Sequence, residues 1–141
     1  MRILGLDVGS RRIGIAISDA EGIIAIPLTV IEHEDEEGVL ECISSLILEE
    51  GVSHIVVGMP RSLDGSLGMQ AKEVEDFICR LSQQIEIPIE TWDERLSTVT
   101  AHKMMVDAGT KKSQRKKKID AIAATVILQG YLDRTQYAIN H

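Results

Sequence analysis

Four acidic residues in three separate segments have the chemistry of a divalent-metal site. Asp7 interrupts the apolar run at the start of the chain, Asp93 and Glu94 follow a second apolar segment, and Asp120 precedes a third. Clustered carboxylates repel one another unless a cation lies among them. Oxygen donors without His or Cys suit Mg²⁺ or Mn²⁺. We expect two such ions, which would activate a water and stabilise the leaving oxygen in phosphodiester cleavage.

Each acid also has a simpler structural explanation. Asp7 is able to accept hydrogen bonds from the backbone of the turn that follows it. Asp93 and Glu94 are able to form a solvated strand end paired with Arg95, and Asp120 is favourable as an acid in the first turn of a helix. Only the combination of the acids favours a shared metal site over these alternatives.

A basic stretch directly before Asp120 is the second chemical feature. The net charge is −7, and residues 13–60 contain no Lys or Arg, whereas residues 111–118 contain six cations and no acid. Cations at a helix N-terminus are electrostatically unfavourable, so we favour binding to a phosphate backbone over a solvated loop. The predicted nucleic-acid-binding residues are Arg11, Arg12, Arg61, Arg95, Lys111, Lys112, Arg115, Lys116, Lys117 and Lys118.

Aromatic residues are few, namely Phe77, Trp92, Tyr131 and Tyr137. Phe77 lies on the predicted inner face of a helix, and the sequence offers no base-stacking platform for single strands. We therefore expect recognition of nucleic acid by backbone shape and charge rather than by its bases.

The elements that must position these residues follow the order β-β-β-α-β-α-β-α-α. Hydrophobic periodicity predicts strands over residues 3–8, 13–18, 23–31, 54–59 and 85–92, and Pro27 predicts an edge strand or a bulge. Helical spacing predicts helices over residues 35–50, 68–83, from 97 to about 108, and 116–133. A strand–helix–strand unit after an antiparallel meander predicts a mixed sheet, with three antiparallel strands and then parallel additions, flanked by helices. Asp120, Ala123 and Ala124 share one helical face, and the two alanines would let that helix approach the sheet.

The overall composition favours one α/β domain over residues 1–141. No segment has the length of a membrane-spanning helix, and the N-terminus has no signal-peptide pattern. Cys42 and Cys79 have no neighbouring cysteine, so we expect reduced, packed thiols in a cytoplasmic protein.

Four motifs together resemble the YqgF (RuvX) family over essentially the full length of the chain. They are LDVGSRRIGIAISD at 6–19, IVVGMPRSLDGS at 55–66, DERLST at 93–98 and KKKIDAIAATVILQGYL at 116–132. The resemblance implies an RNase H-like fold with a mixed five-stranded sheet, similar to Holliday junction resolvases of the RuvC type. The motif set shows no departure from the family pattern. By position, the resemblance implies Asp7, Glu94 and Asp120 as the metal ligands, with Asp93 as the second candidate at the strand end.

The function implied by the resemblance is that of a metal-dependent endonuclease. The expected role is processing of the 5′ end of pre-16S rRNA in ribosome biogenesis. The first alternative is a Holliday junction resolvase in DNA recombination and repair, for which a homodimer is expected. A non-catalytic module that binds RNA or associates with transcription is a further hypothesis. An actin-like ATPase domain is disfavoured, because this chain has room for only one of the two domains that enclose a nucleotide.

Overall fold

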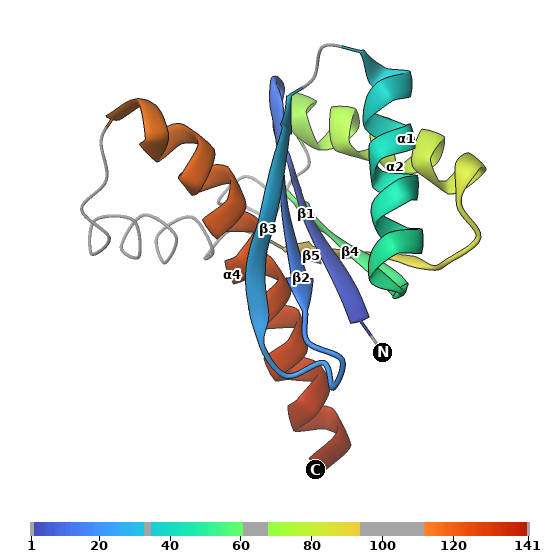
Figure 1. Ribbon diagram of the computed structural model, residues 1–141, viewed down its shortest axis with the longest axis vertical. Coiled ribbons are helices and arrows are strands. Elements are labelled where there is room, and N and C mark those ends of the chain that lie inside the picture. The colour runs from blue at the N-terminus through green and yellow to red at the C-terminus, as the bar shows by residue number, and fades with distance from the viewer. Residues whose placement is uncertain (1, 33–34, 61–67, 94–111, 141) are drawn as a thin grey trace.

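The protein has a five-stranded mixed sheet with helices on both faces (Figure 1). The computed structural model describes residues 2–32, 35–60, 68–93 and 112–140, and in the last helix it describes only the side chains of residues 121–135. The elements are β1 Arg2–Val8, β2 Arg12–Ser18, β3 Ala25–Glu32, α1 Glu36–Glu50, β4 Val52–Met59, α2 Met69–Gln84, β5 Ile89–Asp93 and α4 Lys112–Asn140.

The strand order is β3-β2-β1-β4-β5. β1, β2 and β3 are antiparallel neighbours, and β4 and β5 are added parallel to β1. This topology confirms the predicted sheet. β1, β4 and β5 therefore end at one edge, which we call the carboxyl edge and which is marked by Val8, Met59 and Asp93.

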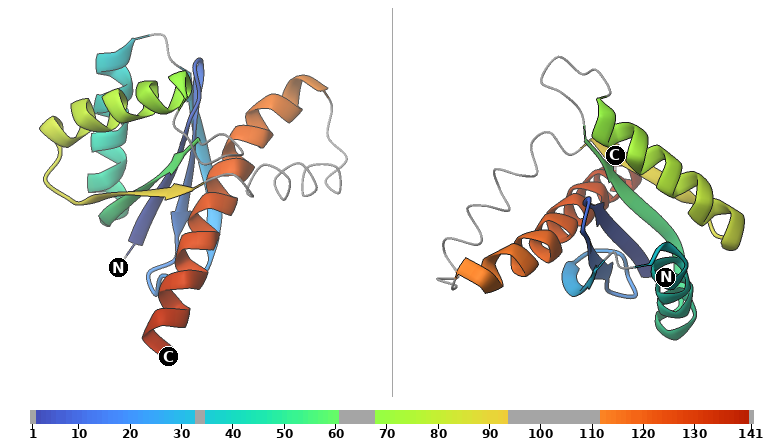
Figure 2. Two further views of the ribbon diagram at one scale, coloured as in Figure 1. Left: turned by 180° about the vertical axis from the view of Figure 1, so that it is seen from behind. Right: turned by 90° about the horizontal axis from the view of Figure 1, so that it is seen from above.

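Helices cover the two faces of the sheet in different ways (Figure 2). α1 and α2 pack on one face, where Leu4, Leu6 and Val8 of β1 are buried. α4 packs on the opposite face, where Ile3 is buried against residues of that helix. Because successive strand residues point to opposite faces, Asp7 lies on the α4 face.

The boundaries of two strands differ from those predicted. β3 begins at Ala25 rather than Ile23, because the Asp19 Oδ1 accepts hydrogen bonds from the amides of Ile23 and Ile24 at 2.7 and 3.1 Å and keeps both residues in the turn. The bonds from Ile24 and Ile23 also lower the pKa of Asp19. β5 begins at Ile89 rather than at residue 85.

Local chemistry explains both ends of α1 and the end of α2. The Asp35 side chain caps α1 by accepting from the Glu37 amide, and Gly51 ends that helix with φ 64°. The Ile85 amide donates to the Leu81 carbonyl, so this residue closes α2 instead of opening β5. Pro27 lies on the edge strand β3, beside a register shift, as predicted.

The last helix begins at Lys112 rather than at residue 116, so the basic stretch is largely helical and not a loop before the helix. Cys42 and Cys79 are exposed rather than packed, because they lie on α1 and α2 outside the buried stripes of those helices. The predicted helix from 97 to about 108 lies outside the described residues. Within the described part of the chain, no helix is long and apolar enough to cross a membrane.

A glycine in the central strand lets α4 approach the sheet. A Cβ placed on Gly5 would lie 2.8 Å from the Leu128 Cβ and 3.1 Å from the Ala124 carbonyl oxygen. Ala124 and Leu128 are fully buried, so this contact has no free space around it. Only a residue without a side chain fits at this position.

We therefore expect Gly5→Ala to destabilise the protein by about 1–3 kcal/mol, because the added methyl group must displace α4. Gly38→Ala is the matched control, since a Cβ there would lie 3.8 Å from its nearest neighbour and alanine favours a helix by up to about 1 kcal/mol. Urea unfolding of the two variants measures both effects. Equal stability of Gly5→Ala and the wild type would show that the contact is looser than described.

Candidate active site

Asp7 stands at the carboxyl edge on the face that α4 covers. It is half-buried, it precedes the last residue of β1, and it pairs with Gly14 of β2. Since Asp7 and Gly5 are two residues apart on one strand, they share a face of the sheet. The carboxylate of Asp7 thus lies on the side where Gly5 contacts α4.

The two faces of the sheet separate Asp93 from Asp7. Asp93 pairs with Met59, which is buried in the core under α1 and α2. Trp92 pairs with Gly58 and packs against the α4 core instead. Asp93 is therefore placed on the face opposite to Asp7, while Trp92 shares the face of Asp7.

Residue 120 lies on α4 one helical turn before Ala124, which itself contacts Gly5. In Figure 1, α4 runs from the end of the sheet where β1 finishes toward the end where β1 starts. The backbone of Asp120 therefore lies toward the carboxyl edge relative to Ala124. Its side chain, like the whole of Glu94, lies outside the described part of the structure.

A tight turn after Asp7 links β1 to β2. The Gly9 amide donates to the Arg12 carbonyl at 2.9 Å, and a Cβ on Gly9 would lie only 2.7 Å from that same oxygen. Arg12 is half-buried and, two residues before Gly14, shares the face of Asp7. Arg11 is exposed on the turn. The turn thus brings one predicted cation to the face of the candidate acid and leaves the other in solvent.

The basic stretch forms the first turns of α4. Lys112, Arg115 and the lysines at 116–118 are on this helix, whose first turn has no acid. These turns project beyond the sheet in both Figure 1 and Figure 2. The predicted cations Arg61, Arg95 and Lys111 lie outside the described residues. The helix therefore presents a concentration of positive charge beyond the part that packs on the sheet.

Asp7 is the one predicted metal ligand whose side chain the structure describes. Among the side chains that the structure describes, no three His, Cys, Asp or Glu residues gather into a metal site. The two carboxylates predicted to join Asp7, those of Glu94 and Asp120, are not among those side chains. A half-buried carboxylate at the carboxyl edge fits an oxygen-liganded ion, and Asp7 meets that requirement.

The fold matches that of a solved RuvC structure. RuvC of T. thermophilus, solved in complex with a Holliday junction substrate, aligns with a TM-score of 0.62 over 96% of each chain at 13% sequence identity. The fold is therefore RNase H-like, as in RuvC-like resolvases.

The chain belongs to the RuvX family, whose model, described as Holliday junction resolvase, matches residues 1–134. A relative in Desulforamulus reducens is 48% identical over 133 residues, which are 94% of this chain and 97% of the relative. A second relative in Halothermothrix orenii is also 48% identical over 133 residues, 94% of this chain and 95% of the relative. Both carry the name "Putative pre-16S rRNA nuclease".

Sequence reasoning missed the part that Gly5 has in positioning the site. A glycine inside an apolar strand is unfavourable for that strand and often marks a close approach of another backbone, which was the available signal. It also missed the pairing of Trp92 with Tyr131, whose ring centroids are 6.3 Å apart. These two residues are far apart in the sequence, and only the packing of α4 beside β5 brings them together.

The turn after Asp7 leads to a prediction about Gly9. We expect Gly9→Ala to lower stability by about 1–3 kcal/mol, because the methyl group would collide with a backbone oxygen that cannot move without opening the turn. Gly38→Ala is again the control, since a Cβ there would lie 3.8 Å from its nearest described neighbour. The melting temperature should fall clearly for the first variant and should not fall for the second. Indistinguishable melting temperatures for all three proteins would contradict the described turn geometry.

Proposed function

We propose that this protein is a metal-dependent endonuclease that processes the 5′ end of pre-16S rRNA. The observation that carries the reaction type is the position of Asp7, half-buried at the carboxyl edge on the face where α4 approaches most closely. Membership of the RuvX family supports phosphodiester hydrolysis as the reaction. The names of the two relatives support ribosomal RNA as the substrate.

The metal ligands in this proposal are Asp7, Glu94 and Asp120. Asp120 precedes Ala124 by one turn of α4. In this proposal its carboxylate would reach Asp7 from the helix that covers this face of the sheet. Asp93 lies on the face of β5 opposite to that of Trp92 and Asp7, which disfavours Asp93 as the third ligand. Its neighbour Glu94, which the family pattern favours, is therefore the proposed third ligand.

Two Mg²⁺ or Mn²⁺ ions bound by these carboxylates would supply an activated water and neutralise the charge on the leaving 3′ oxygen. The chain itself would hold the substrate. Arg12 on the face of Asp7, and the cations in the first turns of α4, would bind phosphates on either side of the cleaved bond. We place this activity in the cytoplasm, where the predicted RNA substrate is made.

Branched DNA is the second candidate substrate. The description of the family model and the RuvC-like fold favour it. Cleavage of a four-way junction requires cuts in two strands related by symmetry, so this activity would need a homodimer. Size-exclusion chromatography with and without a junction is the corresponding measurement.

Substitution of single acids tests the proposed ligand set. We expect Asp7→Asn, Asp120→Asn and Glu94→Gln each to lower Mn²⁺-dependent cleavage by at least about 100-fold, because each removes a charged ligand while keeping the side-chain shape. Asp93→Asn is the matched control and should stay within about threefold of the wild type. A large loss in Asp93→Asn together with an active Glu94→Gln would reverse the assignment at the strand end.

The substrate is tested by offering pre-16S rRNA and a four-way junction side by side with Mn²⁺, with Asp7→Asn as the blank. Faster cleavage of the RNA supports the proposal, and faster cleavage of the junction supports the second candidate. A non-catalytic module would instead bind RNA with a strong salt dependence that survives Asp7→Asn, and the wild type would cleave neither substrate.

A further inference from the structure

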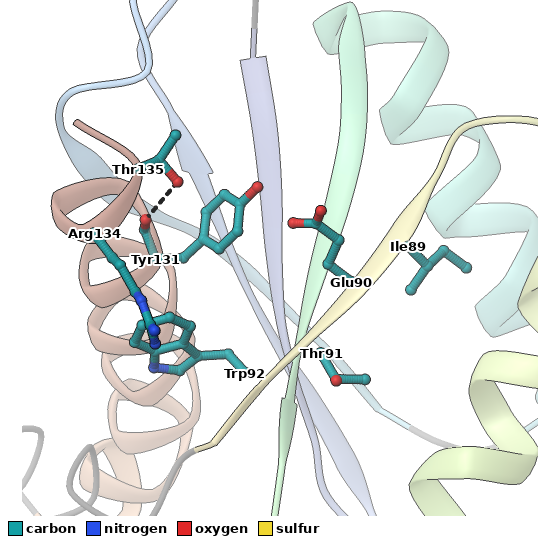
Figure 3. A pocket seen from close by; sticks show the side chains of 7 residues that line it. All are labelled: Ile89, Glu90, Thr91, Trp92, Tyr131, Arg134 and Thr135. Atoms are coloured by element: carbon teal, nitrogen blue, oxygen red, sulfur yellow. Dashed lines mark hydrogen bonds between the residues drawn. The ribbon is translucent and has the colours of Figure 1, made fainter. Parts of the chain in front are cut away.

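A pocket beside the candidate active site has the composition of a nucleobase site. It lies between β5 and α4 and has a volume of about 720 Å³, within the range of about 300–1,000 Å³ usual for ligand sites (Figure 3). Glu90 and Trp92 line it from β5, and Tyr131, Arg134 and Thr135 line it from α4. Its walls therefore combine aromatic rings, a guanidinium, a carboxylate and hydroxyl groups.

The aromatic part of the pocket is held in place by α4. The Trp92 and Tyr131 rings meet edge to face with an interplanar angle of 88°, and the Arg134 guanidinium lies 5.9 Å from the Trp92 ring. A Cβ on Gly130 would lie 3.3 Å from the indole, so the backbone of the helix also contacts this ring. Arg134 is exposed and can move to stack on a base. Unpaired bases bind on such combinations of aromatic rings and arginine planes.

The polar part of the pocket points a carboxylate into the same space. Figure 3 shows the Glu90 carboxylate directed toward the Tyr131 hydroxyl. Desolvation, followed by a hydrogen bond and a charge interaction with Glu90, raises the pKa of Tyr131. The same hydroxyl lies 3.2 Å from the His54 Nε2, and the His54 Nδ1 lies 3.3 Å from the Ser53 Oγ. This chain of hydrogen bonds fixes the orientation of Tyr131, which in turn orients Glu90.

The charge of Glu90 favours the base of a nucleotide over its phosphate in this pocket. A carboxylate repels phosphate, and it accepts hydrogen bonds from N–H groups with both of its oxygens. Guanine presents two neighbouring donors on its Watson–Crick edge, N1–H and the N2 amino group, which match a carboxylate in a bidentate pair. Uracil presents a single N–H donor on that edge.

The pocket is one to two nucleotides away from the proposed catalytic acid. Trp92 pairs with Gly58, and the β1–β4 register of Leu6 with Val57 places Asp7 level with Gly58. Two strand spacings, about 10 Å, therefore separate the backbones of Trp92 and Asp7. Both residues are on the α4 face, so a strand bound at Asp7 can place a neighbouring base in the pocket.

We propose that this pocket, which we call the β5–α4 pocket, binds an unpaired guanine next to the cleaved bond. Trp92 and Arg134 stack on the base, and Glu90 accepts from its Watson–Crick edge. This inference rests on the proposed nuclease function for its biological role, but binding of the base itself requires neither metal nor cleavage. It differs from the sequence-based prediction that nucleic acid is recognised by backbone shape and charge rather than by its bases.

The test uses Trp92, which is the only tryptophan of the chain, as an internal fluorescent probe. The full-length protein is titrated, without divalent metal, with guanosine 5′-monophosphate, uridine 5′-monophosphate and inorganic phosphate. We expect saturable quenching by the guanosine nucleotide with a Kd at least tenfold lower than for the uridine nucleotide, and no quenching by phosphate. Glu90→Gln should raise the Kd for the guanosine nucleotide at least tenfold. Glu86→Gln, an exposed acid outside the pocket, should leave it unchanged.

Equal quenching by both nucleotides, or an unchanged Kd in Glu90→Gln, would overturn the guanine assignment. Competition by inorganic phosphate would overturn it as well, because it would identify an anion site. Glu90 is exposed, and a melting curve of Glu90→Gln checks that the variant is folded. If the wild type cleaves RNA but its fluorescence is not selectively quenched, only the guanine-binding proposal is refuted. If its fluorescence is selectively quenched but it cleaves nothing, the guanine-binding proposal is supported and the nuclease proposal is refuted.

Discussion

The contact between Gly5 and α4 is the constraint on which the rest of the structure depends. With the Leu128 Cβ only 2.8 Å from the position of a Cβ on Gly5, the helix lies as close to the central strand as packing allows. Asp7 is two residues after Gly5 on the same face of β1, and residue 120 is one turn before Ala124, the other α4 residue that contacts Gly5. A single close contact therefore fixes the separation between two elements that each carry a candidate metal ligand.

Different parts of α4 contribute to the core, to the β5–α4 pocket and to the basic surface. Its middle residues Ala124, Ile127 and Leu128 form the core on one face of the sheet, and Tyr131 and Arg134 line the β5–α4 pocket. Its first turns carry the basic residues and extend past the sheet. The Gln129 side chain also binds both the Ala25 amide and the Ile23 carbonyl, which ties the β2–β3 turn to the helix. Any shift of α4 would therefore disturb the acids, the pocket and the basic surface together.

Local patterns in the sequence predicted most of the fold. Alternating isoleucines at 13, 15 and 17 predicted β2, helical spacing of apolar residues predicted α1, and Pro27 predicted an edge strand or bulge, because each depends on chemistry within a few residues. The predicted start of α4 at residue 116 was wrong. The unfavourable interaction of the basic stretch with the helix dipole is small compared with the stabilisation that packing gives to this 29-residue helix. The placement of Asp93 on the face opposite to Asp7 needed the pairing of β5 with β4, and the pocket needed the contact of β5 with α4. Neither long-range arrangement can be derived from local periodicity.

The central claim is that α4 carries Asp120 to Asp7 to form one metal site, and a crystal soaked in Mn²⁺ tests it most directly. Anomalous scattering locates the ion without any assumption about substrate or rate. We predict a peak whose first coordination shell contains oxygens of both the Asp7 and the Asp120 carboxylates. A peak that contacts neither acid, or an Asp120 side chain directed away from Asp7 in the soaked crystal, would contradict the account.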